Sequence, residues 1–110
     1  MEARVWLSYD LGVKGDYPGL YAWLDDHKAV ECGDSIASFL YKCTNRDMLE
    51  GELLSELEGA VHLSSSDRLY IVYRKADGGV TGRYIHGRRK SNPWEGFGAK
   101  GNEESESESE

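Results

Sequence analysis

Residues 6–24 read WLSYDLGVKGDYPGLYAWL and combine a strand, a loop and a helix in one short segment. Over residues 3–9 apolar and polar side chains alternate, with an aromatic on the second face, which is the period-two pattern of a half-buried strand. The strand ends at Asp10, and a loop with two glycines follows. Asp16 is a typical N-cap for a helix over 17–28, because its side chain accepts from the free N–H groups of a first turn.

The remaining elements follow from the same two periodicities. We expect strands over 29–33, 36–43, 68–75 and 80–87, and a second helix over 46–58 that Asn45 begins and Gly59 ends. The order is β-α-β-β-α-β-β, and its first six elements are the ferredoxin-like split βαβ arrangement. We therefore predict an α+β fold, ferredoxin-like βαββαβ, in which two helices cover one face of an antiparallel sheet. The extra C-terminal strand extends the sheet of its own chain or pairs with a partner's edge.

The chain has 110 residues, which is the size of one domain. We divide it into a ferredoxin-like domain over 1–87, a basic and aromatic extension over 88–100 and a disordered acidic tail over 101–110. The tail holds five glutamates, so it supplies five of the seven net negative charges and leaves −2 for the rest. No apolar run reaches the roughly 20 residues that span a bilayer, and the N-terminus lacks a secretory pattern. We expect a cytoplasmic protein with no membrane partner.

Basic side chains gather near the end of the expected domain. No acidic residue lies from Gly78 to Trp94, whereas four cations and the aromatic residues Tyr84 and Trp94 do. Lysine and arginine neutralise phosphates and aromatic rings stack on bases, so this segment predicts contact with nucleic acid. The expected contact residues are Arg83, Arg88, Arg89 and Lys90, with the last three holding the phosphate backbone. The alternative is a solvated basic strand end that only offsets the acidic tail.

Three segments give the chain a resemblance to a known family. The strand ending in SYDL, the helix DYPGLYAWL and the later segment SSSDRLYIV resemble the small ferredoxin-like proteins related to the second CRISPR-associated adaptation protein, in particular a stand-alone, SinR-like branch. The virulence-associated D-type toxins share this plan more distantly. The resemblance covers roughly residues 3–86 and implies a homodimer.

The resemblance also implies a site at Asp10. In nuclease members of the family the aspartate that ends the first strand faces its symmetry mate across the dimer axis, and the pair holds Mg²⁺ or Mn²⁺ that activates water for phosphodiester cleavage. The polar segment SSSDR matches one that the family often uses, which adds Arg68 to the expected nucleic-acid contacts. The other interpretation of Asp10 is an ordinary turn residue that hydrogen-bonds its own backbone.

Two functions of different classes fit these observations. The first is a nucleic-acid-binding homodimer joined through its last strands, with endonuclease activity at paired Asp10 carboxylates left open. The second is a non-enzymatic protein-binding module, such as a toxin–antitoxin or defence-system component, which contacts its partner through the acidic tail and the aromatic segment NPWEGF at 92–97. The sequence does not distinguish RNA from DNA.

Overall fold

A computed structural model describes residues 1–98 of the chain; the expected acidic tail at 101–110 lies outside the described residues. The described part contains five strands, two α-helices and one turn of 3-10 helix. In chain order they are β1 (Glu2–Asp10), α1 (Tyr17–Asp26), β2 (Val30–Gly33), β3 (Ile36–Lys42), η1 (Arg46–Met48), α2 (Leu49–Ala60), β4 (Arg68–Arg74) and β5 (Val80–His86).

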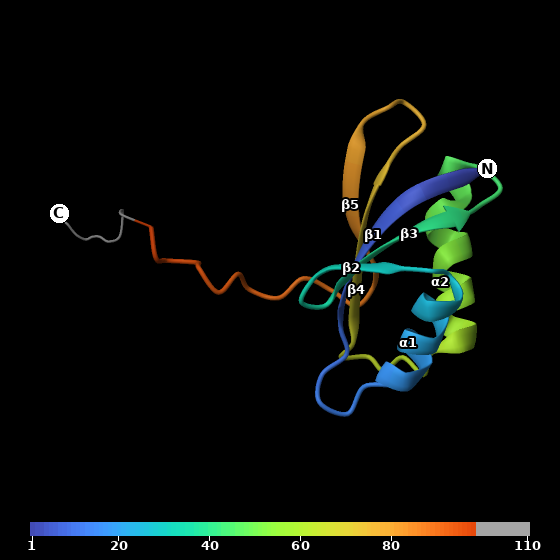
Figure 1. Ribbon diagram of the computed structural model, residues 1–110. Helices are drawn as coiled ribbons and strands as arrows, with labels where there is room; N and C mark the ends of the chain where they lie inside the picture. The colour runs from blue at the N-terminus through green and yellow to red at the C-terminus, as the bar shows by residue number, and fades with distance from the viewer. Residues whose placement is uncertain (99–110) are drawn as a thin grey trace.

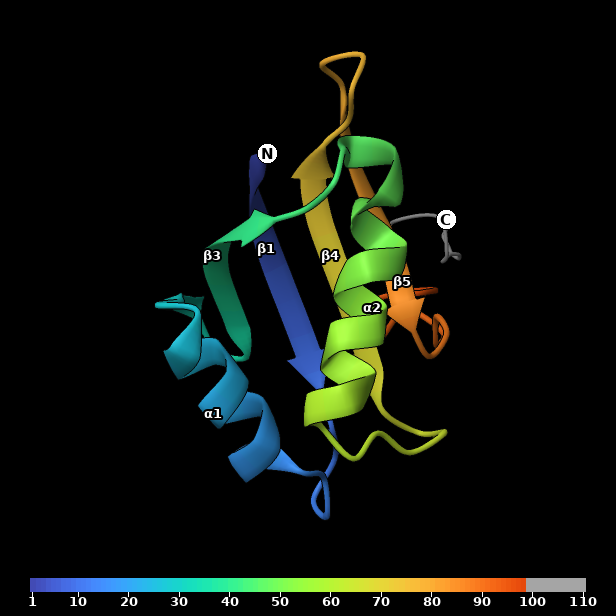
Figure 2. The same ribbon diagram turned by 90° about the vertical axis from the view of Figure 1, so that its right-hand side faces the viewer.

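The strands form one sheet in the order β2-β3-β1-β4-β5, and all neighbouring strands are antiparallel. Both helices lie on the same face of this sheet, as Figure 1 shows with the sheet seen on edge and Figure 2 with the helices in front. The expected α+β class with an antiparallel sheet and two helices is therefore confirmed. The fifth strand pairs with β4 of its own chain, with Tyr70 opposite Tyr84.

The core lies between the sheet and the two helices. Alternate side chains of β1, such as Val5 and Leu7, point into it and are fully buried. They meet Leu20 of α1 and Leu53 of α2, which are also fully buried. Each such side chain contributes about 1.5–3 kcal/mol relative to an exposed one, so the alternation in β1 fixes which face of the sheet the helices cover.

Asp16 begins α1 as predicted, and it also joins the two helices. Its Oδ1 accepts from the backbone N–H of Gly19 at 3.0 Å, and its Oδ2 accepts from the N–H of His62 at 2.9 Å. Because His62 follows α2, one carboxylate holds the start of the first helix against the end of the second. These two hydrogen bonds lower the pKa of the Asp16 carboxyl below its usual value.

The second helix differs from the prediction at both ends. Asn45 does act as a cap, since its Oδ1 accepts from the N–H of Met48 at 3.0 Å, but it begins the 3-10 turn that precedes α2. The expectation that Gly59 ends the helix is wrong. The helix continues through Ala60, and the backbone becomes extended at Val61, whose side chain is buried. Burial of this apolar residue, rather than a left-handed glycine, ends α2.

Alanine substitution should have opposite effects on stability at two glycines, Gly59 in α2 and Gly87 after β5. Gly59 is helical and an added Cβ there meets open space, so Gly59→Ala should raise the free energy of unfolding by about 0.5–1 kcal/mol. Gly87 has φ +82°, and a Cβ there would lie 2.3 Å from the carbonyl oxygen of Asp67. Gly87→Ala should therefore destabilise the protein by more than about 1 kcal/mol.

Urea denaturation followed by circular dichroism measures both effects. Gly51→Ala is the matched control for the first variant, because Gly51 also lies in α2 with open space around it. A loss of stability in Gly59→Ala alone would contradict the helical assignment and restore Gly59 as a left-handed helix end.

Candidate nucleic-acid interface

The candidate interface lies on the face of the sheet that the two helices leave open (Figure 1). The side chains of β1 that alternate with the buried ones point to this face, and they end in Asp10. Two apolar side chains are exposed on this face toward the start of β1: Trp6 and, opposite Arg4 on β3, Leu40 are each about half exposed. The end of β1 is polar and charged. We call the half around Trp6 and Leu40, which also carries Glu2 and Arg4, the apolar half, and the half around Asp10 the charged half. The expected site residues lie in the charged half.

Asp10 forms an ion pair with Arg68. The two residues are register partners in the pairing of β1 with β4, and Nη2 of Arg68 donates to Oδ2 of Asp10 at 2.9 Å. The other oxygen, Oδ1, accepts a longer hydrogen bond from the backbone N–H of Gly12 at 3.4 Å. The hydrogen bond from Arg68 is the largest of the effects that lower the pKa of the Asp10 carboxyl, so this group is ionised at neutral pH.

The arrangement around Asp10 bears on the expected metal. Its carboxylate already faces a guanidinium, which repels a cation, and its contact with Gly12 is that of a turn residue. Among residues 1–98, no three side chains of histidine, cysteine, aspartate or glutamate are placed to share a metal ion. Mg²⁺ and Mn²⁺ prefer several oxygen ligands. The donor set of a single chain therefore does not fit either ion, and a site at paired Asp10 residues depends on a second subunit.

Two tyrosines stand beside this ion pair. Tyr70 of β4 and Tyr84 of β5 are cross-strand neighbours, and their rings meet edge to face with centroids 4.8 Å apart. The hydroxyl of Tyr84 accepts from Nη1 of Arg68 at 3.5 Å. Gly82 lies under the ring of Tyr70, where an added Cβ would be 2.2 Å from the phenol oxygen. The glycine in β5 therefore lets the tyrosine lie across the neighbouring strand.

The C-terminal extension forms the other wall of the site. Gly87 packs against the backbone of Asp67 and Arg68, and its positive φ lets the chain leave β5 onto the open face. Two turns follow, closed by hydrogen bonds from the N–H of Glu95 to the carbonyl of Asn92 and from that of Phe97 to that of Trp94. The extension runs away from the helices (Figure 1).

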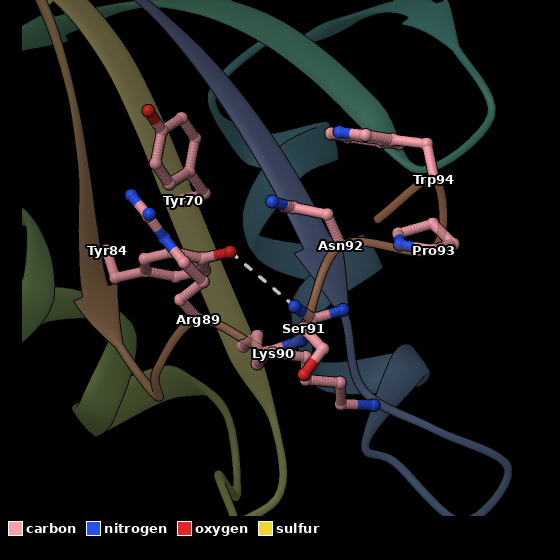
Figure 3. A pocket seen from close by; sticks show the side chains of 9 residues that line it. Tyr70, Tyr84, Arg89, Lys90, Ser91, Asn92, Pro93 and Trp94 are labelled. Atoms are coloured by element: carbon pink, nitrogen blue, oxygen red, sulfur yellow. Dashed lines mark hydrogen bonds between the residues drawn. The ribbon is translucent and has the colours of Figure 1, made fainter. Parts of the chain in front are cut away.

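Sheet and extension together enclose a pocket of about 630 Å³. Figure 3 shows Tyr70 and Tyr84 of the sheet on one side and Asn92, Pro93 and Trp94 of the extension on the other. The lining residues are Arg68, Tyr70, Tyr84 and the run from Arg89 to Trp94. A smaller recess of about 130 Å³ adjoins it and is lined by Ser8, Asp10, Arg68, Tyr70 and Tyr84.

The structure brings together some of the predicted contact residues and separates others. Arg68, Arg89 and Lys90 all line the pocket. Arg88 is exposed but does not line it. Arg83 lies on the opposite face of the sheet, where its Nε pairs with Oε1 of Glu50 in α2 at 3.2 Å. The segment that looked like one basic cluster is thus divided, because side chains of a strand alternate between its faces.

Sequence reasoning missed Tyr70 and Asn92. Tyr70 belongs to the strand expected over 68–75, where it lies two residues after Arg68 and therefore on the same face. This two-residue spacing from Arg68 could have predicted that Tyr70 lies at the site, once the strand over 68–75 was predicted. Asn92 carries no pattern of its own, and only the path of the extension brings it to the pocket.

Comparison with known proteins finds no matching family model, no matching curated protein and no matching solved structure. The resemblance to the CRISPR-adaptation family therefore stays a prediction, and the site has to be interpreted from its own chemistry. None of the helices in residues 1–98 has the length and apolar character that crossing a membrane requires.

The ion pair makes a prediction about titration. In Arg68→Gln the pKa of the Asp10 carboxyl should rise toward its usual value, because the main cause of its depression is removed. The pair stabilises the fold above the unfolded-state pKa, and this contribution is lost as the pH falls through the lower, folded-state pKa. Carbon-detected NMR of the carboxyl group follows the titration.

Arg74→Gln provides the matched control, since Arg74 lies on the same face of the same strand and bonds the carbonyl of Gly78 instead. It should leave the titration of Asp10 unchanged. An equal rise of the Asp10 pKa in both variants would contradict a specific pair with Arg68.

Proposed function

We propose that this protein binds single-stranded nucleic acid in the pocket between the open face of the sheet and the C-terminal extension. The observation that carries the proposal is that three cations and three aromatic rings line one pocket. The cations are Arg68, Arg89 and Lys90, and the rings are those of Tyr70, Tyr84 and Trp94. Phosphates bind to the first set and bases stack on the second.

The charge distribution supports a local interface. The chain as a whole is acidic, with a formal net charge of −7, so general electrostatic attraction does not explain binding to a polyanion. Trp94 has 69% of its surface exposed, and the tyrosines are partly exposed, so these rings are accessible to bases. Bases in a duplex are stacked on one another, whereas those of a single strand are free to stack on side chains. The proposal covers RNA and DNA alike.

The arrangement of the first six elements supports the ferredoxin-like class. The order β2-β3-β1-β4 with antiparallel neighbours, and both helices on one face, is what a split βαβ arrangement requires. In this proposal β5 is an addition at the edge next to β4. That addition supplies Tyr84 and leads into the extension that forms the second wall of the pocket.

We further propose a homodimer joined through the apolar half of the open face and the edge at β5. Trp6, Leu40 and Val80 point to that half and are between 43% and 67% exposed. Burying them against a second copy would leave the charged half of each subunit free. Light scattering of the full chain gives the mass that separates a dimer from a monomer.

Cleavage of the bound strand is the second candidate, and it depends on a different dimer, in which the charged halves of two subunits face each other. Its support is that Asp10, whose side chain is half exposed, lies beside the proposed phosphate contacts. Because one chain lacks enough oxygen ligands, both Asp10 residues would have to meet and Arg68 would have to leave its carboxylate. The residues that would hold Mg²⁺ or Mn²⁺ are the two copies of Asp10, and the ion would activate water.

A binding experiment tests the proposal. In fluorescence anisotropy with labelled strands of about ten nucleotides, the double variant Arg89→Gln/Lys90→Gln should bind more weakly than wild type. The slope of log K against log salt should fall by roughly 1.4, about 0.7 for each lost phosphate contact. Arg83→Gln removes the same kind of charge from the opposite face and should change neither quantity.

Two further arms decide between the candidates. Incubating the same strands with Mg²⁺, Mn²⁺ or chelator, for wild type and Asp10→Asn, tests cleavage; metal-dependent cleavage lost in Asp10→Asn establishes a nuclease. Absence of binding to every strand, or equal weakening by Arg83→Gln, would contradict the pocket as the binding site. The function would then move to the protein-binding module, for which Trp94 and Phe97, 69% and 84% exposed, offer contacts.

A further inference from the structure

The small recess beside the main pocket contains hydrogen-bonding groups that the fold itself does not use. Its five lining residues include Asp10 and Arg68, and it shares Arg68, Tyr70 and Tyr84 with the main pocket. The recess thus adjoins the place where bases would stack. Half of the Asp10 side chain and a quarter of the Arg68 side chain are exposed, so a ligand reaches both.

The acceptors and donors of this pair can be counted. An ionised carboxylate has about four lone-pair sites on two oxygens, and Asp10 uses one for Arg68 and one, over a long distance, for Gly12. A guanidinium has five N–H donors, and Arg68 uses one toward Asp10 and one toward Tyr84. One acceptor site on each carboxylate oxygen therefore stays free, next to free donors of the guanidinium.

This pattern matches one base. The Watson–Crick edge of guanine presents two adjacent donors, N1–H and the 2-amino group, followed by the acceptor O6. A carboxylate receives the two donors together, and a neighbouring arginine donates to O6. Uracil, thymine, cytosine and adenine each place an acceptor where guanine has one of its two adjacent donors. That acceptor would be repelled by the carboxylate oxygens. A carboxylate has no proton to offer in return.

We propose that Asp10 and Arg68 form a guanine-selective subsite, in which both carboxylate oxygens of Asp10 accept from the guanine edge and the guanidinium of Arg68 donates to O6. This inference rests on the proposed binding of single strands. The ion pair fixes both side chains before the base arrives, and the contact to Tyr84 restrains the arginine further. Restraint of this kind reduces the entropy that recognition costs.

Base-substituted strands test the subsite. The probes are RNA and DNA strands of about ten nucleotides, composed of uridine or thymidine, with one central position occupied by guanine, adenine, cytosine or hypoxanthine. Wild type should bind the guanine strand about 10- to 100-fold more tightly than the uniform strand. Hypoxanthine keeps O6 and N1–H but lacks the 2-amino group, so its strand should fall between these two.

Two variants identify the residues responsible. Asp10→Asn should remove the preference for guanine, measured as the ratio of this variant's affinities for the guanine strand and the uniform strand, because amide nitrogen replaces one acceptor with a donor. Arg68→Lys keeps the charge but lacks the planar fork, and should reduce the preference as well. Glu2→Gln is the matched control, since Glu2 lies on the same face at the other end of β1.

The outcomes separate this inference from the function on which it rests. Tight binding of all strands with equal affinity would overturn the guanine subsite and leave the proposed function intact. A guanine preference that survives in Asp10→Asn would also overturn it. Absence of binding to every strand would overturn both.

Discussion

Both helices pack on one face of a five-stranded sheet, and this constraint determines what the other face can do. Because side chains of a strand alternate, every residue of β1 that fills the core has a neighbour that points to the open face. The core residues Val5 and Leu7 therefore fix the direction of Trp6 and Asp10. A slip of one residue in the pairing of β1 would turn Asp10 toward the core and Leu7 toward the open face. Burying the unpaired charge of Asp10 would cost too much free energy for this register to form.

The site then depends on how three separate segments meet on that open face. Asp10 and Arg68 are paired directly across β1 and β4, and Tyr84 follows on β5. Gly87 allows the chain to pass close to the backbone at Arg68 and brings the extension over the tyrosines. The chemistry of the pocket is thus a consequence of strand order, of one ion pair and of one glycine with positive φ.

Much of this fold could be predicted from local sequence. The period-two strands, the caps Asp16 and Asn45, and the turn between the last two strands are local signals, and the structure confirms them. The end of α2 could not be predicted, because whether Gly59 is helical or left-handed depends on the burial of Val61. Local patterns therefore identify elements better than they identify where tertiary packing ends them.

The candidate site was harder to predict than the fold for a related reason. Asp10 and Arg68 are 58 positions apart, so their pairing follows only from strand order and register. The basic segment at 83–90 looked continuous along the chain, whereas the pairing of Arg83 with Glu50 on the helix-covered face divides it. The sequence contains the cations and the aromatic residues, but their grouping into one pocket follows only from the three-dimensional arrangement.

The most direct measurement is a map of where a single strand binds. Backbone amide signals of the isotope-labelled full chain are followed by two-dimensional NMR while an unstructured oligonucleotide is added. The account predicts that the signals that shift belong to the end of β1, to the start of β4, to Tyr84 and to residues 87–94. Shifts concentrated on α1 and α2 would contradict it, because those helices cover the face of the sheet opposite the pocket.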